Sequence, residues 1–172
     1  MLVYVRGAGD IATGIALRLY RCGFHVVMAD LVVPTSIRRT VCFSEAIRLG
    51  ETKVEDVRSV LCADAGAARA AMDEGNVAVL VDPEATMARE LKPDVLVDAI
   101  LAKKNLGTTR GMAPVVIGVG PGFTAQGDVD AAVETMRGHY LGRVYYKGSP
   151  IANTAIPGLI GGYAGERALR AP

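Results

Sequence analysis

The sequence is poor in the residues that build metal centres and disulfide frameworks. Its 172 residues include three cysteines and two histidines. Cys22, Cys42 and Cys62 form no CxxC pair, and no cluster of cysteine and histidine has metal-ligand spacing. An odd and sparse cysteine count is typical of reduced thiols in a cytoplasmic protein. We therefore expect no metal site and a cytoplasmic location.

The sequence also has no excess of charge of one sign and no long apolar run. Nineteen basic residues stand against 18 acidic ones, which leaves a net charge of +1. This balance argues against nucleic acid or an anionic membrane as a partner. The apolar run at the N-terminus meets a charge at Arg6, so it is too short for a signal peptide or a membrane span. No other run approaches the ~18 apolar residues that a membrane helix needs.

What the sequence does contain is a large apolar fraction and much glycine. Hydrophobic residues make up 51% of the chain, and its length favours one domain with a sizeable core. Glycine occurs 20 times, well above its usual ~7% share. Many of these glycines follow apolar runs, which indicates loops that approach another group closely.

The stretch VYVRGAGDIATG near the N-terminus organises the chain. An apolar run over residues 2–6 predicts a buried strand, and apolar residues at helical spacing follow from Asp10. Gly7 permits a sharp turn, Gly9 lets a phosphate approach the backbone, and the small Ala12 lets the helix pack close to the strand. A helix N-terminus also attracts an anion. The pattern predicts the first half of a βαβ nucleotide-binding unit.

Two acidic residues bear on whether this motif binds a nucleotide. Asp30 ends the next apolar run, 21 residues after Gly9, which is close to the spacing of the acid that binds a ribose hydroxyl. Asp10 is expected to be the N-cap of the helix, where its carboxylate would lie near any pyrophosphate. The alternative, that the glycine turn only joins strand to helix, stays open.

The rest of the chain alternates between strand and helix patterns. Strands are expected over residues 25–30, 57–62, 77–81, 95–98, 115–119 and 143–146, the last at a sheet edge. Helices are expected over residues 41–49, 63–74, 84–91, 128–136 and 157–160, and a polar turn over residues 51–56. This order predicts an α/β fold, a Rossmann-like three-layer α/β/α domain over residues 1–172 with a mostly parallel sheet.

Further candidate residues follow the second strand. Arg38 and Arg39 are suited to a phosphate or carboxylate because guanidinium binds oxyanions bidentately, although a solvated or interface pair is an equal alternative. Cys42 beside them is either a thiol with a lowered pKa or, more in keeping with its type, a small buried residue.

A second glycine turn, GVGPGF, follows the expected strand at residues 115–119. Gly118, Gly120 and Gly122 could form an anion-binding nest of N–H groups. In doubly wound sheets ligands bind beyond the carboxyl ends of the strands. The sequence therefore predicts one anion site shared by both glycine turns. Its binding residues would be Gly7, Ala8, Gly9, Asp10, Ile11, Asp30, Arg38, Arg39, Gly118, Gly120 and Gly122.

The sequence contains no strong candidate for a catalytic residue. Asp98 stands at the carboxyl end of a strand, and Lys103 and Asn105 lie in the polar loop that follows it. With Cys42 they are the weak candidates, and an ordinary solvated loop is as good an interpretation of residues 102–109. Whether the protein is an enzyme stays open.

Several whole strings resemble one known family. They are VRGAGDIATGIALRL, RRTVCFSEA, VLVDP, PDVLVDAILAKKN, IGVGPGFTA, VETMRGHYLGRV and IPGLIGG, in order along nearly the whole chain. The sequence resembles the YqeB-like accessory proteins of selenium-dependent molybdenum hydroxylases, which are distantly similar to the XdhC/CoxI accessory proteins. The resemblance implies a Rossmann-like domain that serves the maturation of a molybdenum hydroxylase.

The resemblance has two departures. Family members continue past the segment that matches RALRAP into a small β-rich domain similar to biotinyl or lipoyl carriers, so this chain is expected to be a short form or a fragment. The position of Cys42 is often not cysteine in the family, which weighs against a catalytic thiol.

Three functions follow from these observations. The first is an accessory factor that binds a dinucleotide or a molybdopterin dinucleotide, with the hydroxylase or its maturation machinery as partner. The second is an NAD(P)-dependent oxidoreductase, in which Asp30 would favour NAD. The third is a non-enzymatic adaptor, and a homo-oligomer is compatible with each.

Overall fold

A computed structural model describes residues 1–152 of the chain, so the helix expected at residues 157–160 lies outside the described residues. The strands are β1 (Leu2–Arg6), β2 (His25–Asp30), β3 (Glu51–Val54), β4 (Val57–Cys62), β5 (Val77–Val81), β6 (Val95–Asp98), β7 (Val115–Val119), β8 (Ala131–Val133) and β9 (Val144–Tyr145). The helices are α1 (Asp10–Arg21), α2 (Glu45–Leu49), α3 (Ala65–Asp73) and α4 (Ala88–Leu91), with 3₁₀ turns η1 (Arg39–Val41) and η2 (Arg110–Met112).

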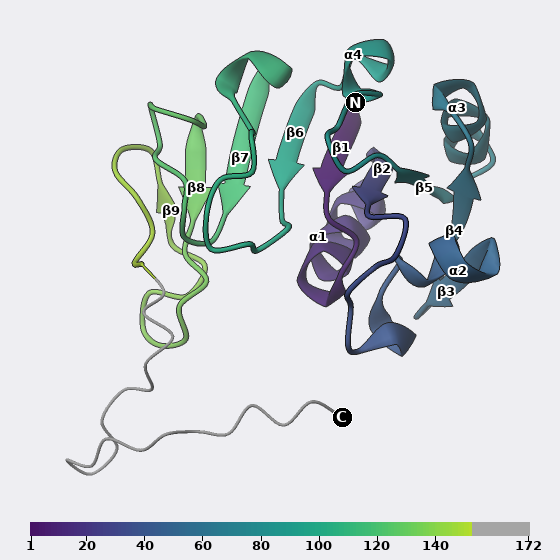
Figure 1. Cartoon of the computed structure of the whole chain (residues 1–172), viewed down its shortest axis with the longest axis horizontal. Helices are drawn as coiled ribbons and strands as arrows, with labels where there is room; N and C mark the ends of the chain where they lie inside the picture. Colours follow the sequence, from purple (N-terminus) through teal and green to yellow (C-terminus); the bar gives the residue numbers. More distant parts are fainter. Residues whose placement is uncertain (153–172) are drawn as a thin grey trace, which may run out of the picture.

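The described strands form one sheet in the order β3-β4-β5-β2-β1-β6-β7-β8-β9 (Figure 1). β3 and β9 pair antiparallel at the two edges, and every other neighbouring pair is parallel. The predicted α/β fold with a mostly parallel, Rossmann-like sheet is confirmed. Parallel strands need crossover connections, and the alternation of strand and helix patterns supplied them.

The central strands are continuous apolar runs because helices cover both of their faces. Along β1, Val3 and Val5 belong to the core layer under α1 and α2, whereas Tyr4 points into the layer under α3 and α4. Helix α1 buries Ala12, Ala16 and Leu17 against the first layer. In Figure 1 the half of the sheet from β6 to β9 is joined by loops and short turns instead of long helices.

The polar turn expected over residues 51–56 is wrong, because its first four residues form β3. This strand pairs with β4, so that Glu51 lies opposite Val60 and Val54 opposite Val57. Glu55, at a φ of 55°, and the residue after it make the connection. An edge strand with one face in solvent can be polar. Such a segment forms a strand because it hydrogen-bonds to a neighbouring strand, and its own composition does not reveal this.

The helix expected over residues 128–136 is also wrong. Residues 131–133 form β8, which adds to the free edge of β7. Two backbone bonds flank this ladder: Asp130 N donates to Val116 O at 2.8 Å, and Gly120 N donates to Val133 O at 2.8 Å. A run rich in alanine and valine suits both structures, and the open edge of β7 decided in favour of the strand.

The chain after β8 is organised by a buried carboxylate. Glu134, 1% exposed, accepts backbone hydrogen bonds from Thr135, Met136 and Ile151 at 2.8–2.9 Å. The Tyr145 hydroxyl, on β9, lies 3.4 Å from the same carboxylate. Burial alone would raise the pKa of Glu134, but these hydrogen bonds lower it. One ionised side chain thus holds the segment that returns to the sheet edge.

Three other expected helices are shorter in the structure. The helix expected over residues 41–49 begins only at Glu45, because Cys42 has extended backbone angles. The one expected over residues 63–74 is α3, whose N-cap is Asp64. The one expected over residues 84–91 is reduced to α4. Within residues 1–152, no helix combines the length and apolar character that crossing a bilayer requires.

Candidate functional site

A cleft lies where the strand order reverses. The chain runs from β1 to β2 and on to β3 at one edge of the sheet, returns through β4 to β5 beside β2, and then crosses to β6 on the other side of β1. The cleft has a volume of about 850 Å³ and opens at the carboxyl ends of these strands. Its lining comes from residues 6–12 except Ala8, and from residues 29–31, 35–38, 83–84, 99–101 and 106. This is the position at which doubly wound sheets bind ligands.

The glycine turn after β1 forms one wall of the cleft. Gly7 has a φ of +93°, and a Cβ there would lie 2.9 Å from the carbonyl oxygen of Ala99. Glycine is therefore required so that the turn can pass close to the chain leaving β6. Gly9, at a φ of −70°, is the N-cap residue of α1. The expectation that Asp10 is the N-cap is wrong, because Asp10 is the first residue of the helix.

Asp30 supports this turn from the end of β2. Its Oδ2 accepts the backbone N–H of Ala8 at 2.8 Å, and its Oδ1 accepts that of Leu31 at the same distance. Asp30 is also one of the residues that line the cleft. Each carboxylate oxygen can accept a further hydrogen bond. Asp30 can therefore hold the glycine turn and still accept a ligand hydroxyl.

Asp10 and Arg38 form an ion pair at the same cleft. Arg38 Nε lies 2.6 Å from Asp10 Oδ2, and both residues are on the lining. The other carboxylate oxygen accepts the N–H of Ile11 at 2.9 Å. Arg39 points elsewhere, because it pairs with Glu45 at 2.7 Å and does not line the cleft. The sequence predicts both arginines as anion-binding residues, whereas in the structure Arg38 lines the cleft and Arg39 does not.

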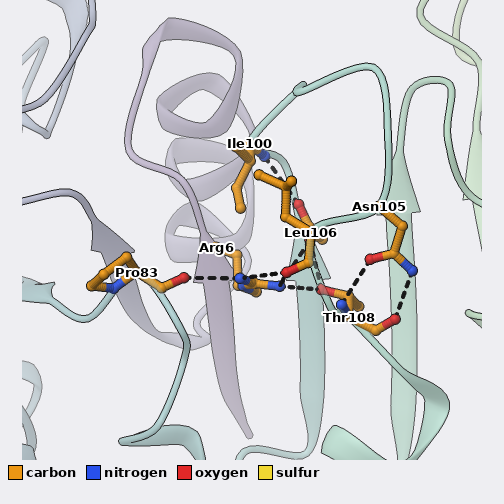
Figure 2. A network of polar contacts seen from close by, with 7 residues as sticks. Arg6, Pro83, Ile100, Asn105, Leu106 and Thr108 are labelled. Atoms are coloured by element: carbon orange, nitrogen blue, oxygen red, sulfur yellow. Dashed lines mark hydrogen bonds and ion pairs between the residues drawn. The ribbon is translucent and has the colours of Figure 1, made fainter.

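The floor of the cleft contains a buried arginine that sequence reasoning missed as a site residue. Arg6, at the end of β1, is 3% exposed. Its Nη1 donates to Thr108 Oγ1 at 2.6 Å and lies 3.3 Å from Asp98 Oδ2, while its Nη2 donates to the carbonyl of Pro83 at 2.8 Å. Figure 2 shows the guanidinium between Pro83 on one side and Leu106 and Thr108 on the other. The only signal in the sequence is a charge that ends an apolar strand.

Asp98 and Asn105 belong to this network and shape the loop after β6. Asp98 is 2% exposed and accepts the Thr108 hydroxyl at 2.6 Å. The Asn105 side chain both donates to Thr108 O at 2.8 Å and accepts Thr108 N at 2.7 Å. Lys103 is exposed, has a φ of 63° and lies outside the cleft lining. Of these three weak catalytic candidates, none has its side chain on the lining.

Cys42, the fourth candidate, is buried beside the cleft. Its Sγ donates to the carbonyl of Arg38 at 3.0 Å. Burial raises the pKa of this thiol, despite the nearby Arg38 charge. The geometry is that of a small core residue in its thiol form.

None of the three glycines of the second turn, Gly118, Gly120 and Gly122, is on the lining of the cleft, so the structure does not place them with the first turn on its walls. A Cβ on Gly118 would lie 2.3 Å from the ring of Phe123. Gly122, at a φ of +106°, leaves no room either, since its Cβ would lie 2.5 Å from Cα of Lys104. Gly120 has a φ of +90°. Close packing and positive φ account for these glycines. Within the described residues no group of three His, Cys, Asp or Glu is placed to hold a metal ion.

Comparison with known proteins gives one informative similarity. The chain is 51% identical over 171 residues to a protein of Escherichia coli (strain K12) described as "Uncharacterized protein YqeB". The match covers 99% of this chain and 32% of that protein, so the chain spans about a third of the length of the curated relative that it matches. This supports the YqeB part of the sequence resemblance. No family model and no solved structure matches the chain.

Proposed function

We propose that this domain belongs to an accessory factor for the maturation of a selenium-dependent molybdenum hydroxylase. In this role it binds a nucleotide-like ligand, a dinucleotide or a molybdopterin dinucleotide, in the cleft between β1 and β6. The observation that carries the binding part is the cleft itself, at the strand-order reversal and against a glycine turn. The accessory part is supported by the resemblance of seven sequence strings and by the similarity to YqeB.

The size and walls of the cleft suit such a ligand. Its volume of about 850 Å³ lies in the range of small-molecule sites. Gly9 has no side chain to keep a phosphate from the backbone, and α1 presents its N-terminus there. Asp30 faces the same space from the end of β2 and can accept a ribose hydroxyl.

The ionisable groups on the lining are carboxylates and guanidinium groups, namely Asp10, Asp30, Glu84, Arg6 and Arg38. Guanidinium stays protonated in proteins, so it binds anions and does not exchange protons. These groups suit the holding of phosphates and hydroxyls. We therefore favour ligand carriage over hydride transfer as the role of this domain.

Thermal unfolding and titration calorimetry with ADP-ribose, NAD⁺ and isolated molybdopterin dinucleotide test the binding. A ligand at 100 times its Kd stabilises the fold by about 2.7 kcal/mol. For a chain of this size that raises Tm by about 5–10 °C. Absence of a shift and of heat with all three compounds would contradict the proposal. Oxidation of an added alcohol with NAD⁺ would favour the oxidoreductase instead.

A matched pair of variants locates the site. Gly9→Val is compatible with the φ of −70°, and its Cβ would lie 3.4 Å from Ser36 Oγ, so the fold should persist while the methyl groups obstruct the phosphate. Gly14→Val makes the same change on the exposed side of α1, where a Cβ meets nothing within 4 Å. Binding should be lost in the first variant and kept in the second. Retained affinity in Gly9→Val would place the ligand elsewhere.

The accessory role needs its own test. Deletion of the gene for this chain should lower the molybdenum hydroxylase activity of the cell while leaving the amount of hydroxylase polypeptide unchanged. Complementation with the Gly9→Val variant should fail, and complementation with Gly14→Val should succeed. Full hydroxylase activity in the deletion strain would contradict the role.

A further inference from the structure

The carboxylate of Asp10 lies at the N-terminus of α1, on the lining of the cleft in which we propose that a ligand binds. It stands at the first residue of α1 and accepts the N–H of Ile11 at 2.9 Å. A phosphate at a helix N-terminus uses the same kind of backbone donor. Arg38 Nε, 2.6 Å from the other oxygen, neutralises this carboxylate. Asp10 and Arg38 therefore place a negative and a positive charge side by side on the lining of the cleft.

This ion pair can open at small cost. The Arg38 side chain is 71% exposed and that of Asp10 is 30% exposed. Exposed ion pairs contribute little to stability, because water solvates both charges when the pair separates. Arg6, the other arginine of the lining, is held by Asp98 and by backbone carbonyls and is 3% exposed. Arg38 is thus the lining cation that can change partners.

The remaining lining charges are negative. Asp30 and Glu84 add to Asp10, while the charge of Arg6 is balanced by Asp98. The Nε of Arg6 is buried and has no hydrogen-bond partner among the described residues. The lining therefore combines one exposed guanidinium group, that of Arg38, with a surplus of carboxylates that disfavours a highly charged anion.

We infer that Asp10 and Arg38 form an exchangeable ion pair that selects ligands by charge. A bridging pyrophosphate takes Arg38 from Asp10 and binds. Asp10 then lies beside the phosphates and repels any further negative charge, which is selection by repulsion. The ligand class is a nucleotide such as ADP-ribose, in which neither phosphate of the pyrophosphate is terminal. A nucleotide that ends in a terminal phosphate carries more negative charge and is disfavoured. This inference rests on the proposed function of the cleft.

Titration calorimetry with ADP-ribose, ADP and ATP tests the inference. In the wild-type chain ADP-ribose should bind at least about tenfold more tightly than ATP, because its phosphates carry fewer charges. Asp10→Asn keeps an oxygen for the N–H of Ile11 and removes the repelling charge, so it should reduce the preference for ADP-ribose over ATP by about tenfold. Arg38→Gln should weaken ADP-ribose by about tenfold. In the double variant the two effects should not add, because the residues form a pair.

Two controls guard the interpretation. Arg39→Gln removes the neighbouring arginine, whose partner is Glu45, and should leave all three affinities unchanged. The unfolding midpoints of Asp10→Asn and Arg38→Gln without ligand should stay within about 2 °C of wild type, since the pair is exposed. If Asp10→Asn unfolds, Asp10→Ser serves as the same test.

The outcomes separate the inference from the proposed function. If the wild-type chain binds ADP-ribose but Asp10→Asn leaves the ratio of the ADP-ribose affinity to the ATP affinity unchanged, the inference is wrong and the proposed function stands. Equal losses in Arg39→Gln and Arg38→Gln would also overturn it. If neither the wild-type chain nor Asp10→Asn binds any of the three nucleotides, the inference is wrong, and if the wild-type chain also binds neither NAD⁺ nor molybdopterin dinucleotide, the proposed function fails with it.

Discussion

The phenol of Tyr4 donates a 2.7 Å hydrogen bond to Asp82 Oδ2, which joins β1 to the residue that follows a non-neighbouring strand. β2 lies between β1, which carries Tyr4, and β5, which Asp82 follows. Asp82 also accepts the backbone N–H groups of Thr86 and Met87. Burial would raise the pKa of Asp82, but these hydrogen bonds lower it. The pair joins the centre of the sheet to the turn that precedes α4.

This pair predicts a pH dependence of stability. Burial, with the Asp82 hydrogen bond, raises the pKa of Tyr4 far above its usual value of 10. Because the folded-state pKa is raised, the stabilisation is complete below about pH 10 and is lost as the pH rises further. Tyr4→Phe should cost about 1–2 kcal/mol at pH 8 and flatten the decline between pH 10 and 11.

Urea unfolding between pH 8 and 11 measures this effect. Tyr20→Phe is the control, because the Tyr20 hydroxyl is exposed and donates to the carbonyl of Gly75 at 2.6 Å. That variant should keep the alkaline decline of the wild-type chain. Parallel stability curves for wild type and Tyr4→Phe would contradict the prediction.

The buried ion pair of Arg6 and Asp98 predicts a large loss when one partner is neutralised. Asp98→Asn leaves the buried guanidinium without its counter-charge, which typically costs about 3–5 kcal/mol. Denaturant unfolding should show this loss. The same measurement on Asp94→Asn, an exposed aspartate whose replacement still offers an oxygen to Leu2 N, should change by about 0.5 kcal/mol or less. Similar losses in the two variants would mean that Asp98 is not an essential counter-ion.

The second glycine turn predicts a contrast between two alanine substitutions. Gly122 and Gly138 both have positive φ, but only at Gly122 does a Cβ clash, 2.5 Å from Cα of Lys104. Gly138→Ala should cost about 1 kcal/mol from the backbone alone, and Gly122→Ala at least about 2 kcal/mol. Chemical denaturation measures both. The affinity for ADP-ribose should be unchanged in Gly122→Ala. A loss of this affinity without a loss of stability would indicate that the second glycine turn is part of the ligand site.

Local pattern was enough for the central strands and the first turn. β1, β2, β5, β6 and β7 lie where they are predicted, because a strand buried on both faces reads as an unbroken apolar run. β3 and β8 were missed for the opposite reason. Each is a strand because a neighbour offers its edge, and pairing partners distant in sequence leave no mark on a short window.

The candidate site divides in the same way. The sequence by itself determined the glycine turn, Asp30 and their place at a strand end, since these depend on spacing within one βαβ unit. Only the tertiary structure decided that Arg38 pairs with Asp10, 28 residues away, that Arg39 turns to Glu45, and that Arg6 lies under the cleft. A long charged side chain reaches any partner that the fold brings within a few ångströms. Residue type sets which bonds it can make, and the packing of the strands sets which of them form.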